Sequence, residues 1–327
     1  MTVRIVVLLL TLVLAALTQS PGVSAQKSSK MHRLGWVSLQ PTPTQLPSIH
    51  AYTVLKAQLA ERGYVEGKNV TFEPRWADGD YKRVPELLAE LERVGVDVIF
   101  APGTKNARIS QDLVKTTPLV VYTCDAFDHV ARLARQGGNV TGVTCMTSEL
   151  TGKRLELLKQ AVPKATRIVF LSEPEDSPSG LKRAQDAAPQ LGIKLTTVAF
   201  KSRGEVPLAL ETVAKERPDA LFVYPDPIAF TERARIAEFA LRQRLPTMYA
   251  FREYVDAGGL MSYGANQLDM FRQVADLSAK IFDGKAPSDL PMLQPTKFEL
   301  VINLKTAKAL GLTIPPSLLA RADQIIE

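Results

Sequence analysis

Short apolar runs alternate with amphipathic stretches along most of the chain. Five runs in the first half predict strands, and three stretches between them have the periodicity of helices. Val, Ile and Leu fill several runs with little polar alternation, which is typical of strands buried on both faces of a parallel sheet. The predicted strands are 33–39, 69–76, 96–101, 119–123 and 140–144, and the predicted helices are 47–62, 81–93 and 104–115.

A second series of the same kind follows. Strands are predicted at 167–171, 194–200, 220–224, 247–250 and 260–263, and helices at 148–161, 179–191, 205–216 and 227–243. Pro189 falls inside a helical pattern and predicts a kink or a shorter helix there. The tail has a helical pattern at 269–283, an apolar run at 298–303 and a short helix at 305–310. It does not fit a third domain, so we expect it to pack back onto the rest.

Strands that alternate with crossover helices indicate an α/β fold built from right-handed βαβ units. The break near 145–150 separates the two series and predicts two Rossmann-like lobes with parallel sheets. No low-complexity linker separates the halves, which favours a multi-strand hinge over a loose tether. We expect residues 26–146 with about 264–288 to form the N-terminal lobe, and residues 147–263 with about 289–327 to form the C-terminal lobe.

The first 25 residues have the features of an export signal. Arg4 precedes an uncharged apolar run, and Val23, Ser24 and Ala25 provide the small residues of a cleavage site. The run covers about 13 residues, whereas a membrane-spanning helix needs roughly 20. We therefore expect a signal peptide that is cleaved after Ala25 and a mature chain that is periplasmic and not embedded in the membrane.

The charge pattern and the cysteine content bear on possible partners and on a possible disulfide. The chain has 40 basic and 34 acidic residues and a net charge of +6. Basic and acidic residues are interleaved and form no basic cluster, so we expect no nucleic-acid partner. Cys124 and Cys145 each follow a predicted strand. A disulfide is geometrically possible if those strands are neighbours. The preferred interpretation is a pair of partly buried free thiols.

Motifs for catalysis and cofactor binding are missing from the sequence. Neither a phosphate-binding loop nor a glycine-rich dinucleotide fingerprint opens a helix. His32, His50 and His129 are far apart and form no metal-binding pair. The segment most similar to the GxSxG motif of a nucleophile elbow is 259–264. Its first glycine lies one residue too far from Ser262 to match that motif. We expect no catalytic residue, no metal and no cofactor.

Binding residues are expected at the carboxyl ends of the strands, where open α/β sheets hold their ligands. Small hydroxyls and glycine N–H groups there suit a carboxylate, and three aromatic side chains suit an apolar group. Asp226 precedes Pro227 and is either a helix cap or an ammonium ligand; Thr104 is either a cap or a ligand contact. Asp125 either contacts the ligand or the opposite lobe, or is an ordinary turn acid. The candidates are Ser38, Gly103, Thr104, Thr123, Asp125, Glu173, Ser177, Ser179, Asp226, Tyr249, Phe251 and Tyr263.

Several sequence blocks resemble one family of solute-binding proteins of ABC importers, which includes tryptophan- and tyrosine-binding components. The blocks are GYVEGKNV at 63–70, RWA at 75–77, GGNVTG at 137–142, GKRLELL at 152–158, GGLMSYG at 258–264, QPTKFELVINLK at 294–305 and PPSLLARAD at 315–323. The resemblance implies a type I periplasmic-binding-protein fold with three crossovers and no catalysis. It also implies cleft positions at Thr104, Asp125, Asp226, Tyr249 and Tyr263.

The chain departs from that family's pattern in two loops. The loop after the fourth strand reads Cys124-Asp125-Ala126, where the family has Gly-Asp-Pro. The loop after the strand at 167–171 reads Glu173-Pro174-Glu175-Asp176, where the family carries Asn-Pro. The second change adds acid to the predicted cleft.

These features favour a monomeric binding protein that closes its lobes on a small ligand and delivers it to an ABC-transporter permease. The expected ligand is an aromatic amino acid or a related carboxylate. One alternative is a sensor that presents its ligand to a chemoreceptor or kinase. The other is an exported hydrolase or isomerase, which would need perturbed carboxylates in the cleft, and Asp125, Asp226 and Glu173 are the candidates.

Overall fold

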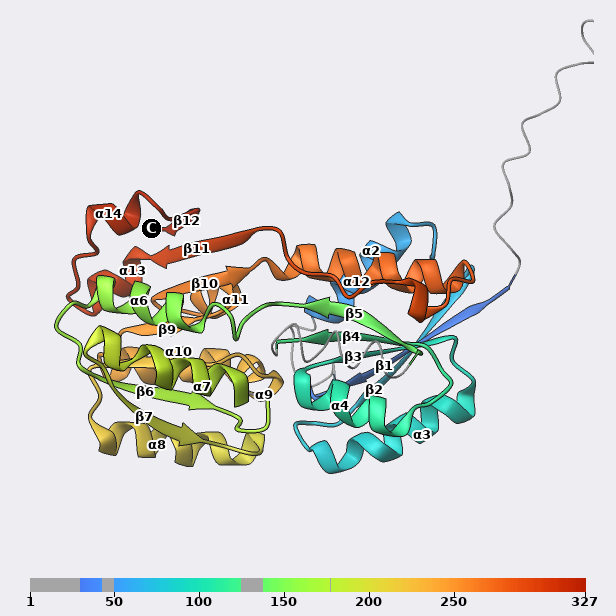
Figure 1. Ribbon diagram of the computed structural model, residues 1–327, viewed down its shortest axis with the longest axis horizontal. Helices are drawn as coiled ribbons and strands as arrows, with labels where there is room; N and C mark the ends of the chain where they lie inside the picture. The colour runs from blue at the N-terminus through green and yellow to red at the C-terminus, as the bar shows by residue number, and fades with distance from the viewer. Residues whose placement is uncertain (1–29, 43–49, 125–137, 177) are drawn as a thin grey trace, which may run out of the picture. The chain divides into compact units, whose positions relative to one another are not determined.

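The computed structural model describes residues 30–42, 50–124, 138–176 and 178–327. Strands and helices alternate along the chain, as the sequence predicts (Figure 1). The strands are β1 (His32–Ser38), β2 (Val70–Trp76), β3 (Val98–Pro102), β4 (Leu119–Thr123), β5 (Val140–Thr144), β6 (Arg167–Ser172), β7 (Lys194–Ala199), β8 (Ala220–Val223), β9 (Thr247–Tyr249), β10 (Met261–Ala265), β11 (Phe298–Asn303) and β12 (Gln324–Ile326). The α-helices are α2 (His50–Glu61), α3 (Val84–Val94), α4 (Thr104–Leu113), α6 (Thr151–Ala161), α7 (Pro178–Ala187), α8 (Val206–Glu216), α9 (Pro227–Thr231), α10 (Arg233–Arg242), α11 (Arg252–Asp256), α12 (Gln267–Phe282), α13 (Leu304–Ala309) and α14 (Pro316–Leu319).

The first sheet is parallel throughout and has the strand order β2-β1-β3-β4-β5. Helices α2 and α12 pack together, and α12 also lies against β3, β4 and β5, while α3 and α4 pack on each other and on the same sheet. Because helices cover the sheet, β4 is buried along its whole length. The continuous apolar run at 119–123 therefore has the burial that a parallel sheet requires.

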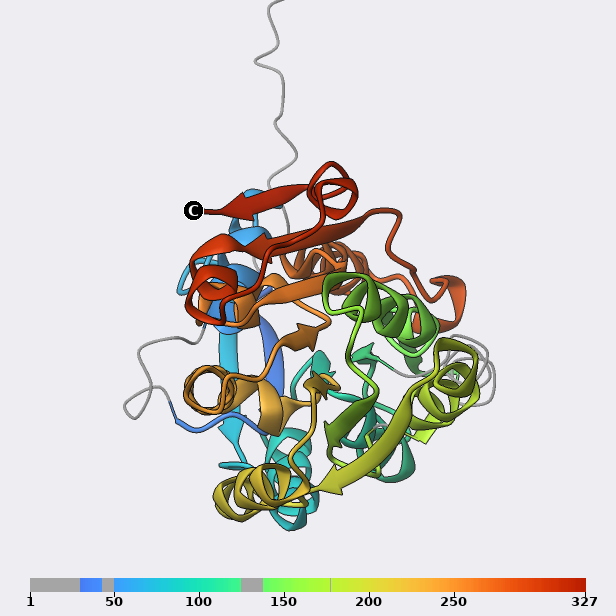
Figure 2. The ribbon, with the colours of Figure 1, turned by 90° about the vertical axis from the view of Figure 1, so that its left-hand side faces the viewer.

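The second sheet has the order β12-β11-β10-β9-β8-β6-β7, and Figure 2 shows β12 at its edge. Its strand pairs are parallel except for β10 and β11, which are antiparallel. The chain returns to this sheet from the first lobe after α12, so β11 runs in the opposite direction to β10. The α/β fold of two lobes with mostly parallel sheets is thus confirmed.

Three segments connect the two sheets. One runs from β5 to α6, and another runs from β10 to α12. The third follows Leu293, whose N–H donates to the Gly142 carbonyl at 2.8 Å and whose carbonyl accepts from the Thr144 N–H at 2.9 Å. Residues 290–293 therefore run beside β5 before the chain crosses to β11.

Local differences from the predicted elements have identifiable causes. The helix predicted at 227–243 is divided at Glu232, which ends α9 and begins α10. Glu232 is 5% exposed and forms ion pairs with Arg203 and Arg235, so the break is fixed by tertiary contacts. The conflict at Pro189 is resolved by ending α7 at Ala187 and continuing as a short 3-10 helix, η3 (Pro189–Leu191). The remaining 3-10 helices are η2 (Tyr81–Arg83), η4 (Arg203–Glu205) and η5 (Pro287–Asp289).

The two cysteines are joined, which corrects the preferred interpretation of two free thiols. Cys124 and Cys145 form a disulfide, with their Cα atoms 5.0 Å apart. Neighbouring parallel strands β4 and β5 end side by side and bring the thiols together. Sequence alone did not establish that these strands are neighbours. Among the described helices, none combines the length and the hydropathy that a bilayer crossing needs.

Candidate ligand-binding cleft

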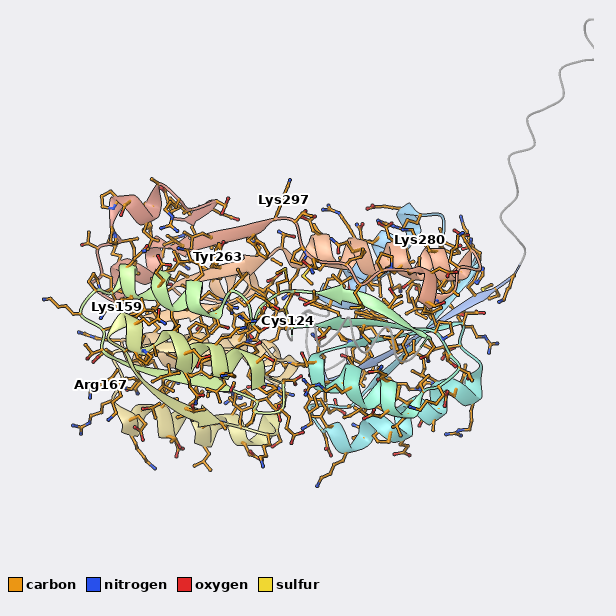
Figure 3. The ribbon with its side chains drawn as sticks, in the orientation of Figure 1. Cys124, Lys159, Arg167, Tyr263, Lys280 and Lys297 are labelled. Carbon is orange, nitrogen blue, oxygen red and sulfur yellow. A yellow bond between two sulfur atoms is a disulfide. The ribbon has the colours of Figure 1, made fainter. Side chains whose placement is uncertain are left out.

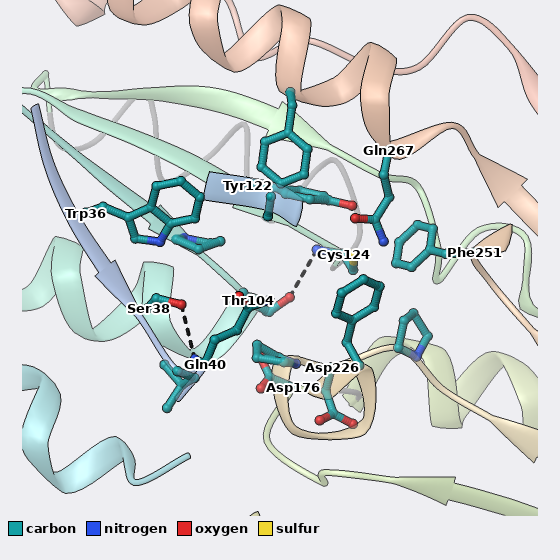
Figure 4. A pocket seen from close by; sticks show the side chains of 18 residues that line it. Trp36, Ser38, Gln40, Thr104, Tyr122, Cys124, Asp176, Asp226, Phe251 and Gln267 are labelled. Carbon is teal, nitrogen blue, oxygen red and sulfur yellow. Dashed lines mark hydrogen bonds between the residues drawn. The ribbon is translucent and has the colours of Figure 1, made fainter. Parts of the chain in front are cut away.

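A cavity lies where the carboxyl ends of strands from the two sheets face each other (Figure 4). It contains about 680 Å³ of empty space, which includes open solvent at its mouth. Strand ends, the loops after them and helix α12 all contribute to its walls. The described lining consists of Trp36, Ser38, Leu39, Gln40, Ala51, Pro102, Gly103, Thr104, Tyr122, Cys124, Asp176, Pro225, Asp226, Pro227, Phe230, Phe251, Gln267 and Phe271.

The first-sheet wall is largely aromatic. Trp36 on β1 is 1% exposed and packs against Phe100, with ring centroids 4.9 Å apart in an edge-to-face arrangement. Tyr122 on β4 is 7% exposed and meets Phe271 of α12 at 5.8 Å. Among the described residues, the Trp36 indole N–H and the Tyr122 hydroxyl have no hydrogen-bond partner. Buried donors normally have partners, so these two atoms are suited to a ligand.

The second-sheet wall is organised by Asp226, which caps α9. Its Oδ1 accepts from the backbone N–H groups of Ile228 at 2.9 Å and Ala229 at 2.8 Å. Its Oδ2 accepts from the Glu173 N–H at 3.3 Å. The capping interpretation of Asp226 is therefore confirmed, and the same side chain also lines the cavity.

Acidic side chains from the second sheet reach the N-terminus of α4 in the first. Asp176 accepts a hydrogen bond from the Tyr81 hydroxyl, and its Oδ1 accepts from the Lys105 N–H at 2.6 Å. The Lys105 ammonium lies 3.3 Å from Glu173 Oε1 and 2.8 Å from Glu175 Oε2. The Asp176 N–H donates to Glu173 Oε2 at 2.7 Å. These contacts join the two lobes beside the cavity.

Burial shifts the protonation of these acids. Asp176 is 2% exposed, and burial raises its pKa to about 6, although hydrogen bonds from Tyr81 and the Lys105 backbone oppose the rise. Burial also raises the pKa of Asp226 well above its ordinary value, and the nearby Asp176 charge adds to the effect. Uncompensated negative charge in the buried site therefore carries a free-energy cost.

Two further contacts connect the lobes beside the cavity. The Tyr224 hydroxyl, at the end of β8, donates to the Cys124 carbonyl at 3.1 Å. Gly103 has φ +99°, and a Cβ placed on it would lie 2.7 Å from Cγ of Pro227. Only glycine combines this backbone conformation with so close an approach. Figure 3 shows Cys124 where the two lobes meet.

The structure brings together five of the predicted site residues in the cavity lining. Thr104 is among them, yet it is the first residue of α4 and not its cap. Its hydroxyl accepts from the Cys124 N–H at 3.1 Å and lies 3.2 Å from Thr123 Oγ1, so it links α4 to the end of β4. The five residues are Ser38, Gly103, Thr104, Asp226 and Phe251.

The other predicted residues lie elsewhere. Thr123 and Glu173 are buried next to lining residues but are not part of the lining. Tyr249 is fully buried and stacks on Tyr254, with centroids 4.7 Å apart. Tyr263 is half-buried and packs near Phe298, and Ser179 is half-buried on α7. Asp125 and Ser177 fall outside the described residues, and so do the export signal and its cleavage site.

Several lining residues escaped the sequence analysis as site candidates. Trp36 lies in mid-strand, where only the alternation of faces along β1 decides which side chains reach the cavity. Gln267 and Phe271 come from α12, which returns to the first lobe after the whole second series. Asp176 was singled out only as part of an acidic loop. The departure of that loop from the family's pattern was the signal that could have identified it.

Within the described part of the chain, no group of three or more His, Cys, Asp and Glu side chains is placed to hold a metal ion. The arrangement instead offers aromatic faces, two buried carboxyl groups and unpartnered donors around an accessible space. These elements can bind and orient a small organic molecule.

The topology and the cleft define a two-lobe α/β binding protein of the type I periplasmic kind. A family model described as ABC transporter substrate binding protein matches residues 47–326. The chain therefore belongs to the ABC transporter substrate-binding protein family.

Individual relatives agree with this assignment. A tyrosine-binding protein of Clostridioides difficile is 23% identical over 259 residues, which are 78% of this chain and 74% of that protein. A conserved domain protein from Vibrio cholerae has 25% identity and a TM-score of 0.79, covering 90% of this chain and 100% of its own. An ABC domain from Streptococcus pneumonia, crystallised with L-Trp, has 23% identity and a TM-score of 0.80, covering 91% and 100%.

Proposed function

We propose that this protein captures a small organic ligand with an aromatic body between its two lobes and delivers it to an ABC-transporter permease. The observation that carries the proposal is the cavity at the junction of the lobes. Aromatic side chains from both lobes line it, together with two buried acids. Membership in the substrate-binding family supports the transport role.

An aromatic amino acid, or a close chemical relative of one, is the proposed ligand class. The rings of Trp36, Tyr122, Phe230, Phe251 and Phe271 supply apolar surface for an aromatic group. Relatives whose names or titles include tyrosine and L-Trp support the same class.

Lobe closure would couple binding to delivery. A ligand that touches both lobes only in the closed state shifts the population toward it by its differential affinity. Reversing a 99:1 bias needs about 5.5 kcal/mol, and a micromolar ligand supplies about 8 kcal/mol in total. A closed form stabilised in this way would present both lobes to the permease as one composite surface.

We also propose that the protein is exported and that its mature chain forms two lobes. The mature chain would begin at Gln26 after cleavage in the periplasm and would act as a monomer. Its N-terminal lobe would comprise 26–146 with about 264–288, and its C-terminal lobe would comprise 147–263 with about 289–327. Mass spectrometry of the secreted protein tests the cleavage, because an intact Met1–Ala25 segment would contradict it.

Ligand screening with a structural readout tests the proposed function. Thermal-shift screening of aromatic amino acids and their derivatives should find a compound that raises the melting temperature, because a ligand that binds only the folded form stabilises it. Saturation with that compound should lower the radius of gyration in solution scattering. An unchanged radius at saturation would contradict lobe closure, and chemical conversion of the ligand would favour an exported enzyme instead.

A further inference from the structure

Building on the proposed function, we infer that the cleft selects an aromatic amine over the corresponding amino acid. Asp176 from the second lobe already occupies the place at the N-terminus of α4 where a ligand carboxylate would bind. The ligand class is thus an organic ammonium ion on a ring that carries a hydrogen-bond acceptor. The buried Trp36 N–H and Tyr122 hydroxyl, which are independent of the acids, have no hydrogen-bond partner among the described residues, and each could bond to an acceptor on that ring.

The N-terminus of α4 is an anion position that the protein fills itself. Gly103 precedes the helix and has no side chain to cap it. Free N–H groups and the helix dipole make such an end favourable for a carboxylate. The Lys105 N–H instead donates to Asp176 Oδ1 at 2.6 Å, across the boundary between the lobes. Asp176 therefore takes the interaction that would otherwise attract the carboxylate of an amino acid.

Asp176 is held firmly in that place. It is 2% exposed, accepts from the Tyr81 hydroxyl and donates its own N–H to Glu173. A ligand carboxylate would have to displace this network or lie beside an acid of the same charge. Like charges in a buried site repel strongly, so an amino acid is disfavoured relative to its amine.

The charges around the cleft call for a cation. Glu173, Asp176 and Asp226 are each at most 5% exposed. Lys105 pairs with Glu173 and also with the exposed Glu175. The charged groups among the described lining residues are Asp176 and Asp226, both acidic. An ammonium ion beside these two carboxyl groups would compensate the charge that burial makes costly.

The opposite end of the cavity has different polarity. Figure 4 shows Trp36 and Tyr122 on the first-sheet side, away from Asp176 and Asp226. The Trp36 N–H can only donate, and the Tyr122 hydroxyl can donate or accept. Both lack a hydrogen-bond partner in the part of the chain that the structure describes, and both are more than nine-tenths buried. A phenolic oxygen that reaches either atom would give it a hydrogen-bond partner, whereas an unsubstituted ring would offer a partner to neither.

Four matched compounds test the inference by calorimetric titration of the mature protein. Tyramine has the amine and the phenol, tyrosine adds the carboxylate, phenethylamine lacks the phenol, and 3-(4-hydroxyphenyl)propionate has the carboxylate without the amine. Tyramine should bind at least tenfold more tightly than tyrosine and about tenfold more tightly than phenethylamine. The propionate should show no binding at concentrations that saturate with tyramine.

Variants of Asp176 identify the cause of this selectivity. Asp176→Ala should weaken tyramine at least tenfold and strengthen tyrosine, because the α4 N-terminus becomes available to the ligand carboxylate. Asp176→Asn, which keeps the shape, should weaken tyramine without a gain for tyrosine and serves if the alanine variant fails to fold. Asp186→Ala is the matched control, since Asp186 is an exposed acid of α7 in the same lobe, and it should change neither affinity.

The possible results separate the two proposals. Tyrosine binding more tightly than tyramine would overturn the amine inference and leave the proposed capture of an aromatic ligand intact. Unchanged affinities in both Asp176 variants would also overturn it. Failure of all four compounds and of tryptophan and tryptamine to bind would count against the aromatic ligand class itself.

Discussion

Asp176 has two structural roles. It lines the ligand cavity, and it bonds to Tyr81 and to the N-terminus of α4 in the other lobe. Its burial makes the ionised form costly, and the nearby Glu173 charge adds to that cost. One carboxyl group therefore connects protonation and lobe contact with the ligand choice that we propose.

The raised pKa of Asp176 predicts how stability depends on pH. A carboxyl whose pKa is about 6 in the folded state and about 4 in the unfolded state binds more protons when folded. Its contribution to stability is therefore complete below about pH 4 and is lost as the pH rises through about 6. The shift corresponds to a change on the order of 3 kcal/mol. Melting temperatures measured from pH 4 to pH 8 should fall over this interval.

The Asp176→Asn variant removes this effect. Glu253 also has a raised pKa, chiefly through burial, and contributes a background slope in both proteins. Asp226 loses the Asp176 charge that helps to raise its pKa, so its share of the slope is smaller in the variant. From about pH 4 to about pH 7 the wild type should lose stability relative to the variant, and above that range the difference between them should stay constant. A constant difference across that range would show that Asp176 does not titrate as expected.

Gly103 predicts a second effect at the residue scale. Gly103→Ala would place a methyl group against Pro227 of the other lobe, at a backbone φ of +99° that alanine adopts poorly. Ligand affinity should fall at least tenfold because the lobes cannot approach as closely, and stability should fall by about 1 kcal/mol. Gly192→Ala is the control, because Gly192 also has a positive φ but has open space around its Cβ position. It should lose stability and keep its affinity.

The elements themselves were largely predictable because they follow strong apolar patterns. All five strands of the first sheet match the apolar runs, since strands covered on both faces leave a continuous signal. The short helices α11 and α14 and the edge strand β12 span five residues or fewer, too few for a periodic pattern. The division at Glu232 depends on Arg203, which is distant in sequence, so no local pattern could reveal it.

The site was less predictable than the elements. Five residues that were chosen for their position at a strand end line one cavity: Ser38, Gly103, Thr104, Asp226 and Phe251. The same criterion does not tell which face a side chain takes, and Tyr249 is stacked on Tyr254 inside its own lobe. Trp36 could be placed in the cavity only from the orientation of its strand, and Gln267 only from the return of α12 to the first lobe. Both are properties of the tertiary structure.

The disulfide ties two of these elements together and predicts a dependence on redox state. It joins the ends of β4 and β5 over a sequence separation of 21 residues. Closing a loop of this length stabilises a protein by roughly 3 kcal/mol. Reductant should therefore lower the unfolding midpoint of the wild type. The Cys124→Ala/Cys145→Ala variant should have that lower midpoint without reductant and should not respond to it; equal midpoints for wild type and variant would contradict the prediction.

At the scale of the whole molecule, contacts between the lobes around the cavity influence the balance between closed and open forms. Lys105 pairs with Glu173, which is fully buried, and with Glu175, and it lies over the ring of Tyr81 at 4.3 Å. Removing the ammonium leaves the Glu173 charge without this partner in the closed arrangement, whereas opening the lobes exposes that charge to water. The ion pairs therefore favour closure.

Lys105→Ala should shift the ligand-free protein toward open forms. A change of at least 1 kcal/mol alters the ratio of closed to open forms about fivefold. Solution scattering should show a larger radius of gyration for the ligand-free variant. Lys115→Ala is a suitable control, because Lys115 is exposed and bonds only locally to the Gln111 carbonyl among its described contacts. Identical scattering from all three proteins would show that Lys105 does not govern closure.

The contact between Asp176 and α4 also predicts a limit on how fast the protein can bind a ligand. We expect the carboxyl group to release the helix end, and the lobes to part, before a ligand can bind fully in the cavity. In rapid-mixing experiments the observed association rate should rise with ligand concentration and then reach a plateau equal to that release rate. A transporter supplied by such a carrier would gain little from very high external concentrations, because the carrier itself becomes the slow step.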